Sequence, residues 1–547
     1  MFRDLEAQVR RQSYVQVRDA SRTDDGGWRN PRLGVADPAA NGTAVLSSGA
    51  ALLLLDRSLT TERRAELAER ATAAVRYELR ARRGSGLIDL LAANPDSAPD
   101  TGFALQLFAA ALLLLRREGV PAELAEWESC VLRLLRETVP VMLTAGFHTP
   151  NHRWVIASAA ALAGALLPEE TERWEPDLLA ILDEGLDIDP EGFYPERSVV
   201  VYDAVTNRAM LFLHLFRGTP GALDAVRASL ATDMLLLDSA LRADTGLSSR
   251  QDRGMRAVPV SLADVCLAAG ALCDDDALTR MAGALAATDA PREPGVVFWQ
   301  AWAQAYFERG FGTAAVDQRD EEFWAVFPDK QAARFRSGDA TATVRRDAAF
   351  LGIQIGDVGV HTVRFFQAVH GVGEFVPQTA EFGERLFTAA SRGPRGRRPG
   401  YERPVGRPVD PDGWDAAVER RALRGLEPLD AAVRVELDDA AIAVRIEASG
   451  IPGALAVLLI DVDAGLVAES GDVAVTLGVG QELFLTGESL LLRGATHAVR
   501  ITGGADGHRA WNLRESPAIA PGCARIVIPL ITPVDHRIRI EREEAWR

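Results

Sequence analysis

The sequence is poor in the features that mark disulfide-rich, zinc-binding or membrane-spanning proteins. Its longest apolar run, residues 104–115, is interrupted by Gln106 and is shorter than the about 20 residues that span a bilayer. Four cysteines are too few in 547 residues for a disulfide framework, and no pair has the C-x-x-C spacing of a structural zinc site: Cys130, Cys266, Cys273 and Cys523. We therefore expect no metal, no cofactor and no membrane association.

Positive charge is also in short supply. The 60 Lys and Arg residues against 77 Asp and Glu residues give a formal net charge of −17. Nucleic-acid binders are usually basic, so we expect no nucleic-acid partner. Long-range steering would repel a polyanionic sugar, so any site for one has to be a local basic cleft. Charged residues stand among the first six positions, where a secretory signal needs an apolar core, and we expect a cytoplasmic location.

Length and hydrophobic periodicity predict two domains. Single cores stop growing at about 250–300 residues. From Leu52 to Phe311 apolar residues recur at spacings of three and four, which predicts a series of helices and fits either a bundle or a toroid of helix pairs. From Trp324 onwards, short Val- and Ile-rich segments alternate with Gly, Asp and Pro, which predicts a β-sandwich. The predicted domains are residues 1–323 and 324–547.

One segment of the second domain has neither pattern. Residues 391–408 read SRGPRGRRPGYERPVGRP and are rich in arginine and proline, which disfavours regular structure. One interpretation is a solvated surface loop. The other is an arginine-bearing lid that contacts an anionic substrate.

The eight histidines are scarce candidate acid–base residues. His214 lies in an apolar helical stretch, where a hydrogen-bonded core histidine is expected. His497, His508 and His536 come late in the β region without a nucleophile or base pattern around them. The remaining candidates are His148, His152, His361 and His370.

The first two of these candidates fall in a polar turn, Gly146–Trp154, that opens a predicted helix. Asn151, His152 and Arg153 then lie at the helix start, where free N–H groups and the helix dipole favour an anion. The alternative interpretation is that Asn151 only caps the helix and that its neighbours are exposed.

Two more polar loops precede predicted helices, at residues 191–203 and 248–256. Each is also compatible with an ordinary solvated loop. In a helical toroid, loops at one end converge on a common cleft, and separate loops rich in Asn, His, Tyr and Arg suit an anionic sugar. The candidates that these loops add are Tyr194, Glu196, Tyr202, Arg250 and Gln251.

The layout resembles the heparinase II/III-like polysaccharide lyases. The resemblance rests on two motifs, Asn151-His152 at a helix start and GFYPERS at residues 192–198, which leads to Tyr202. The resemblance implies an α+β multidomain chain, an incomplete (α/α) toroid followed by an antiparallel β-sandwich. The family's His-rich stretch early in the β domain is replaced by His361 and His370 alone. Tyr202 is slightly off the family spacing, so Tyr194 stays a second candidate.

The resemblance implies a metal-independent β-elimination that cleaves a uronate-containing oligosaccharide or polysaccharide. Such a reaction needs the uronate carboxylate neutralised and a base and an acid beside the sugar. The expected catalytic residues are Tyr202, His152 and Asn151. The expected substrate-binding residues are Arg153, Glu196, Arg208, Arg250, Gln251 and His370.

Two alternatives remain at this stage. An (α/α) toroid hydrolase of the unsaturated-uronyl type needs carboxylic acids in the cleft, and Glu196, Asp203 and Asp252 are candidates. A carbohydrate-binding protein without catalytic activity is the other. The net negative charge favours a short, lightly sulfated oligosaccharide as the ligand in each case.

Overall fold

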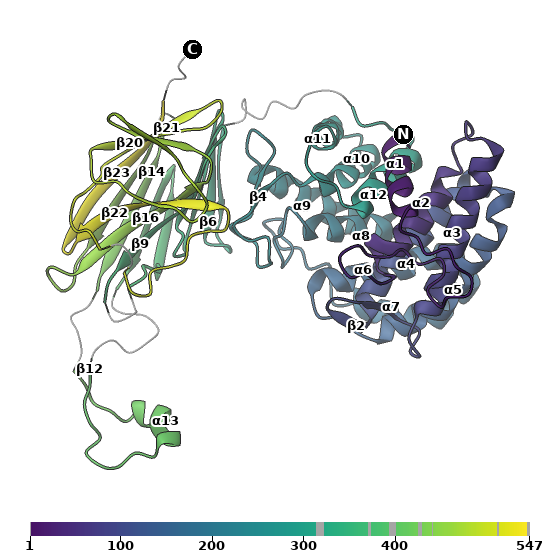
Figure 1. The fold of residues 1–547 in the computed structure, drawn as a ribbon, viewed down its shortest axis with the longest axis horizontal. Coiled ribbons are helices and arrows are strands. Elements are labelled where there is room, and N and C mark those ends of the chain that lie inside the picture. Colours follow the sequence, from purple (N-terminus) through teal and green to yellow (C-terminus); the bar gives the residue numbers. More distant parts are fainter. Residues whose placement is uncertain are drawn as a thin grey trace. The chain divides into compact units, whose positions relative to one another are not determined.

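The protein consists of two compact units (Figure 1). A computed structural model describes residues 2–312, 322–369, 373–392, 401–424, 429–439, 441–510 and 513–543. The helical unit comprises Met1–Met234 and Leu247–Val316, and the sandwich unit comprises Leu235–Gly246 and Asp317–Arg547. The short segment 235–246 therefore belongs with the sandwich, although it lies inside the helical part of the sequence.

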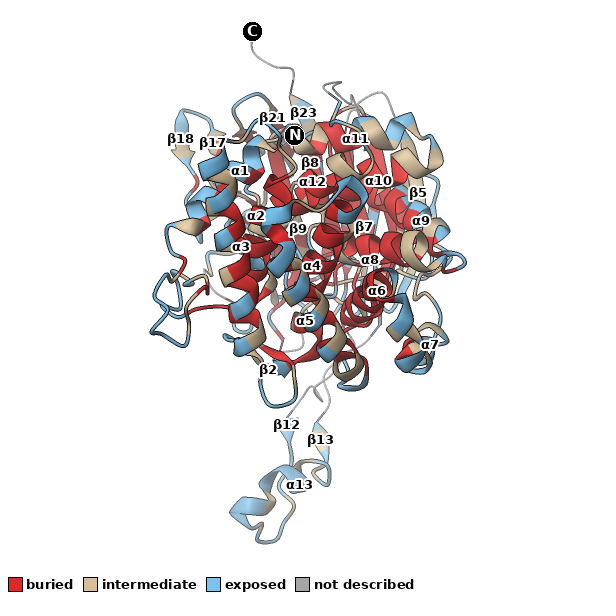
Figure 2. Cartoon of the chain, turned by 90° about the vertical axis from the view of Figure 1, so that its right-hand side faces the viewer, coloured by how far each residue is buried: buried red, intermediate tan, exposed pale blue. Residues whose placement is uncertain are grey.

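Helices dominate the helical unit, and they form an inner and an outer row. Each inner helix packs on the next in the order α2, α4, α6, α8, α10, α12, and α12 also contacts α2. In Figure 2, α4, α6, α8, α10 and α12 are largely buried, whereas α1, α3 and α5 expose an outer surface. The inner helices are α2 Val45–Leu53, α4 Ala98–Glu118, α6 Pro150–Leu166, α8 Tyr202–Arg217, α10 Ala263–Cys273 and α12 Pro294–Tyr306, and the others are α1 Arg3–Ser13, α3 Thr61–Ala81, α5 Ala125–Thr144, α7 Glu175–Leu182, α9 Ala222–Leu236 and α11 Asp276–Ala286.

Several inner helices are apolar on nearly all sides, which explains their burial. In α6 the sequence WVIASAAALAGAL offers almost no polar face, and a helix of this kind is stable only when protein surrounds it. Among the described helices, α4 alone is long and apolar enough to cross a membrane by length and composition, and 83% of its most apolar window is buried inside the protein. A buried core helix passes the same test.

The helical unit also holds a small hairpin that the sequence analysis did not predict. Strands β1 (Ile88–Leu90) and β2 (Asn94–Ser97) pair antiparallel directly before α4. The Ser97 hydroxyl accepts a hydrogen bond from the Asp100 backbone N–H and so caps α4. A two-residue strand, β4 (Arg256–Ala257), lies in the polar loop before α10.

Two sheets form the sandwich unit within the described residues, in the orders β10-β11-β14-β15-β23-β21-β20-β17-β18 and β19-β22-β16-β9-β8-β7-β6-β5. The described strands of these two sheets pair antiparallel, except that the short edge strand β19 runs parallel to β22. The first sheet contains β10 Thr379–Gly383, β11 Leu386–Ser391, β14 Ala431–Leu437, β15 Ala441–Ala448, β17 Val467–Ser470, β18 Val473–Thr476, β20 Ser489–Arg493, β21 Ala498–Thr502 and β23 Val534–Glu543. The second contains β5 Phe323–Phe327, β6 Ala332–Ser337, β7 Ala340–Arg345, β8 Leu351–Ile355, β9 Val358–Gln367, β16 Leu455–Asp463, β19 Glu482–Phe484 and β22 Cys523–Ile531.

Alternating side chains from both sheets meet in one core. Val433 and Val435 of β14 lie in the same buried cluster as Phe365 of β9 and Leu458 of β16. Strand β16 is apolar at nearly every position because its other face is covered too, with Val457 in a second cluster. The predicted fold class, a helical toroid followed by an antiparallel sandwich, is confirmed.

Two further segments complete the sandwich unit. Residues 235–246, with the short strand β3 (Ala243–Asp244), are held by Arg334, which donates to the Leu236 and Leu237 carbonyls at 3.3 and 3.2 Å. Within the arginine-rich segment, residues 393–400 lie outside the described residues. Beyond them, β12 (Tyr401–Glu402) and β13 (Leu423–Arg424) pair, with the short helix α13 (Trp414–Val418) between them.

A buried ion pair crosses two central strands of the sandwich. Arg525 of β22 donates to both carboxylate oxygens of Asp461 of β16, at 2.7 and 3.0 Å, and both side chains are almost fully buried. Arg525 also donates to the Pro517 and Ala518 carbonyls. Every charge in this pair is therefore compensated, as burial requires.

We predict that Arg525→Met destabilises the sandwich by about 3–5 kcal/mol, because it leaves the Asp461 charge buried without a partner. Hydrogen exchange of β16 and β22 in increasing urea measures this loss. The control is Arg445→Met, which breaks an exposed pair with Asp535 and should change stability by about 1 kcal/mol or less. Equal losses in the two variants would contradict the prediction.

A second buried polar pair lies in the helical unit, between α8 and α9. The carboxyl groups of Asp203 and Asp233 are hydrogen-bonded to each other and fully buried. Burial raises the pKa of Asp203 to about 7, against the hydrogen bond from the Ser198 backbone N–H, and burial beside Asp203 raises the pKa of Asp233 well above its ordinary value. The pair therefore retains a proton at neutral pH.

When folding raises the pKa of a carboxyl group, the folded state binds the proton more tightly than the unfolded chain does. The resulting contribution to the free energy of unfolding is fully present below the ordinary pKa of the group and is lost as pH rises to its pKa in the folded state. We predict that the melting temperature of the helical unit falls as pH rises from about 4 to about 7. In Asp233→Asn the fall should be smaller, because the amide can donate to Asp203 without a proton. Circular dichroism melts across this range test it, with the exposed Asp224→Asn on the same helix as control. Parallel curves for wild type and Asp233→Asn would refute the shared proton.

Candidate active site

The three polar loops predicted from the sequence lie next to one another in the helical unit. They precede α6, α8 and α10, which are consecutive inner helices. The Ser249 backbone N–H donates to the Glu196 carbonyl at 3.0 Å, and Arg197 Nε donates to the Leu247 carbonyl at 2.8 Å. The Ser261 hydroxyl donates to the Val200 carbonyl at 3.1 Å. These contacts join the loop before α8 to the loop before α10.

Backbone conformation in the loop before α8 is specialised. Gly192 has φ +83°, and a Cβ atom there would lie 2.6 Å from the Ala228 carbonyl oxygen, so only glycine fits. Arg197 adopts φ +50° despite its side chain, in the left-handed region that costs about 1–2 kcal/mol. Strain of this kind persists where surrounding contacts fix the chain.

Tyr202 is the first residue of α8, and its ring is partly exposed. The Gln251 side-chain amide donates to its hydroxyl oxygen at 2.5 Å. The Arg250 guanidinium carbon lies 4.6 Å from the centre of its ring. A phenol held between a cation and an amide donor can exchange a proton, because both neighbours stabilise negative charge that develops on its oxygen.

Glu196 lies on the other side of the arginine. Its carboxylate is buried, with Oε1 3.5 Å from Arg250 Nε. Burial raises the pKa of Glu196 to about 7, although the Arg250 charge and a hydrogen bond from the Asn151 backbone N–H oppose the shift. The same hydrogen bond gives α6 its cap, since the Thr149 side chain does not cap that helix.

The Asn151 side chain is fully buried in the first turn of α6. Its Oδ1 accepts from the Thr149 hydroxyl at 2.6 Å, which orients the amide. In the described part of the protein, Nδ2 has no hydrogen-bond partner. A buried donor left open in this way is suited to a ligand acceptor.

His152 follows in the same turn and packs edge-on against His148, with ring centres 4.6 Å apart. Burial lowers the pKa of His152 to about 4, with help from the positive charges of His148 and Arg250. The imidazole is therefore neutral at pH 7. Its Nδ1 has no hydrogen-bond partner among the described residues.

The other predicted arginines are engaged elsewhere. Arg153 pairs with Glu184 and Asp187 and stacks on Trp154, at 4.4 Å from the ring centre. Arg208 donates to both oxygens of Asp264 at 2.7 and 3.0 Å. Both guanidinium groups thus hold secondary structure together, and their predicted role in substrate binding stays a prediction.

The competing tyrosine and the β-domain histidines are placed differently from Tyr202. Tyr194 is buried, and its hydroxyl donates to Asn207 Oδ1 at 3.1 Å, a core hydrogen bond that favours Tyr202 as the reactive tyrosine. His361 lies in the sandwich unit with Nε2 2.6 Å from Asp463 Oδ1. His370 lies outside the described residues.

Contacts that the sequence analysis missed tie this cluster together. Asp252, considered there only as a hydrolase acid, accepts hydrogen bonds from the hydroxyls of Ser198 and Ser248. Asp233, the buried partner of Asp203, was not noticed, since a single aspartate in an apolar helix carries no signal of its own. The sequence signal that could have indicated the Asp252 contacts is the polar run SSRQDRG at residues 248–254.

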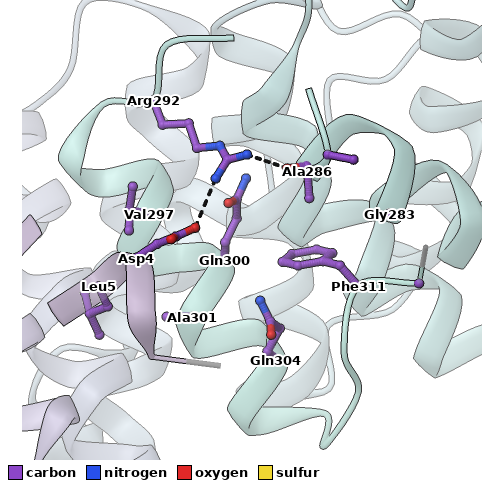
Figure 3. Close-up of a pocket in the computed structure, with 12 residues that line it drawn as sticks. Asp4, Leu5, Gly283, Ala286, Arg292, Val297, Gln300, Ala301, Gln304 and Phe311 are labelled. Carbon is purple, nitrogen blue, oxygen red and sulfur yellow. Dashed lines mark hydrogen bonds and ion pairs between the residues drawn. The ribbon is translucent and has the colours of Figure 1, made fainter. Parts of the chain in front are cut away.

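A separate cavity of about 300 Å³ lies between α1, α11 and α12 (Figure 3). Arg292 spans it and donates to Asp4 at 3.2 Å. Gln300, Gln304 and Phe311 point towards it in Figure 3. The three polar loops contribute no residue to this cavity.

Several solved structures of known proteins have a fold similar to that of this chain. No family model and no curated protein matches the sequence. Heparinase III matches with a TM-score of 0.58, at 10% identity over 99% of this chain and 85% of its own. Xanthan lyase from Paenibacillus matches with 0.56, at 9% identity over 99% and 57%. A mutant chondroitin AC lyase from Streptomyces coelicolor A3 matches with 0.52, at 12% identity over 100% and 79%. The chain therefore has the fold of these polysaccharide lyases.

Proposed function

We propose that the protein is a lyase that cleaves a uronate-containing glycan by β-elimination and leaves a 4,5-unsaturated uronate. The observation that carries the proposal is the setting of Tyr202, whose hydroxyl accepts from Gln251 while Arg250 covers its ring. The Asn151 Nδ2 donor in the neighbouring α6 turn, which has no partner among the described residues, supports it. So does the fold, since the solved structures that share it include lyases named for heparin, xanthan and chondroitin.

Neutralisation of the substrate carboxylate is the first requirement of the reaction. The C5 proton of a uronate becomes acidic enough only when hydrogen bonds or charge compensate the adjacent carboxylate. Asn151 Nδ2 has an unused N–H at full burial, and Arg250 supplies a positive charge. In the proposal these two groups bind the carboxylate, and the bond from Asn151 strengthens as enolate-like charge develops.

Proton transfer is the second requirement. A base takes the C5 proton, the electron pair forms the C4–C5 double bond, and the C4–O4 bond breaks as the leaving oxygen gains a proton. The neutral His152 suits the base, because its low pKa leaves one of its two ring nitrogens unprotonated at pH 7. Tyr202 suits the donor to the leaving oxygen, and for the other C5 epimer it is also the candidate base.

The charge balance of the site supports a lightly sulfated substrate. Two of the arginines predicted to bind substrate, Arg153 and Arg208, already form buried ion pairs with aspartates. Arg250 itself faces Glu196. Arg250 and neutral amide donors can match one carboxylate, and the net charge of −17 disfavours a substrate with several sulfates.

The hydrolase alternative is favoured by one observation, the pKa of about 7 of Glu196, which suits a general acid. Its required partner carboxylate is harder to find. Asp203 is buried against Asp233, and both oxygens of Asp252 accept hydroxyl hydrogen bonds. The two reactions differ in absorbance: that of the unsaturated uronate rises with a lyase and falls with a hydrolase that consumes it.

We predict that Tyr202→Phe lowers the turnover rate by about 10²–10⁴, because it removes the proton-exchanging hydroxyl and keeps the ring. Absorbance of the unsaturated product, measured on a panel of sulfated and unsulfated uronide oligosaccharides, gives the rate. Tyr194→Phe is the matched control and should retain turnover, since that hydroxyl only contacts Asn207. Near wild-type turnover in Tyr202→Phe would remove Tyr202 from the mechanism.

The raised pKa of Glu196 predicts how substrate binding depends on pH. Below about pH 7 the carboxyl is neutral and leaves the Arg250 charge to the substrate, whereas above it the carboxylate competes for Arg250 and repels the substrate. KM should therefore rise as pH increases through about 7, and in Glu196→Gln it should stay low while turnover is kept. Glu184→Gln, an exposed carboxyl on the same unit, should follow the wild-type profile. Abolished activity in Glu196→Gln would favour the hydrolase.

A further inference from the structure

The proposed chemistry needs three side chains from two segments to keep a fixed geometry. Tyr202 is on α8, whereas Arg250 and Gln251 are on the loop before α10. The side chains that these segments bring to the site are long and can change conformation. Displacement of a catalytic group by about 1 Å costs on the order of 10² in rate, so their positions have to be fixed. The contact that holds the two segments at the level of their backbones is therefore of functional interest.

Asp252 makes that contact. Its side chain is buried, with Oδ2 accepting from the Ser198 hydroxyl at 2.8 Å and Oδ1 accepting from the Ser248 hydroxyl at 2.5 Å. Ser198 precedes α8, and Ser248 lies in the arginine-bearing loop. One carboxylate thus joins the two segments through two hydroxyl groups.

Each serine hydroxyl oxygen also accepts a hydrogen bond from the backbone N–H of a candidate site residue. The Tyr202 N–H donates to Ser198 Oγ at 3.3 Å, in addition to the Ser198 carbonyl at 2.9 Å. The Arg250 N–H donates to Ser248 Oγ at 3.0 Å. Because each hydroxyl proton is given to Asp252, each oxygen is free to accept from these backbone groups. The chain of bonds runs from Tyr202 to Arg250 with every donor matched to an acceptor.

We propose that Asp252 is a positioning residue, which fixes Arg250 and Gln251 against the Tyr202 hydroxyl through Ser198 and Ser248. The proposal rests on the function proposed above for Tyr202. Both oxygens of Asp252 are used as acceptors from hydroxyls, so its role is to hold the two segments and not to exchange protons with substrate. The hydrogen bonds from Ser249, Arg197 and Ser261 to carbonyl oxygens also join the segments, but none of them involves the backbone N–H of Tyr202 or Arg250.

The charge of Asp252 also acts on the neighbouring acid. Glu196 is faced by Arg250, Asp252 and Asp187, and the negative charge of Asp252 contributes to the raised pKa of Glu196. Removing that charge should lower the pKa of Glu196. A positioning role at this site therefore has a signature in the pH profile that loss of a remote structural contact would not produce.

The test is Asp252→Asn in the full chain, compared with Ser248→Ala and the double variant. We expect turnover to fall on the order of 10² in Asp252→Asn with a smaller change in KM, and the pH at which KM rises to move downwards. The double variant should be no slower than Asp252→Asn, because both changes break the same chain of bonds. Ser261→Ala, which removes a hydroxyl contact to Val200 between the same segments, is the control and should keep wild-type turnover.

Hydrogen exchange supplies a readout that does not depend on activity. In Asp252→Asn and in the milder Ser248→Ala, the amides of residues 198–203 and 248–253 should exchange faster together, while the other inner helices stay protected. Unchanged exchange, or unchanged turnover in Asp252→Asn, would overturn the positioning role. A wild-type protein that acts on no uronide would instead refute the proposed function, and the exchange data would still decide whether Asp252 holds the two segments together.

Discussion

The first turn of α6 is buried, and its backbone N–H groups have to find acceptors inside the protein. The Thr149 side chain does not supply one, and the Glu196 carboxylate, from the loop before the next inner helix, accepts from the Asn151 N–H instead. This one hydrogen bond caps α6 and places the loop before α8 beside it. It also sets a carboxyl group of raised pKa against Arg250. The site is therefore assembled by the same need for acceptors that allows an apolar helix to be buried.

Burial also divides the charged residues into two groups. Arg153, Arg208 and Arg525 are each surrounded by carboxylates and carbonyls, and they hold neighbouring elements together. Arg250 is only partly buried, and its guanidinium lies between a tyrosine ring and a carboxyl whose charge depends on pH. An ion whose counter-charge is adjustable can exchange that partner for a ligand, whereas a fully paired buried ion loses stability if it does so.

Much of the fold was predictable because it follows from local periodicity. Apolar spacings of three and four before Phe311 and alternation after Trp324 reflect which faces must be buried, and that pattern is present in each segment separately. The hairpin of β1 and β2 was missed because its strands are three and four residues long and largely polar. The segment 235–246 was assigned to the helical part because its place in the sandwich unit depends on contacts with Arg334, about a hundred residues later.

For the candidate site, the sequence by itself determined which polar loops precede apolar helices, since Asn151, His152 and Tyr202 stand at helix starts and the pattern of polar residues there is local. It did not determine which arginine is available. Arg153, Arg208 and Arg250 are alike in sequence, and only the tertiary structure paired the first two with aspartates and placed the third between the Tyr202 ring and Glu196, whose pKa is raised. The physical reason is that charge state and availability depend on burial and on partners from distant segments, neither of which a residue's neighbours in the chain specify.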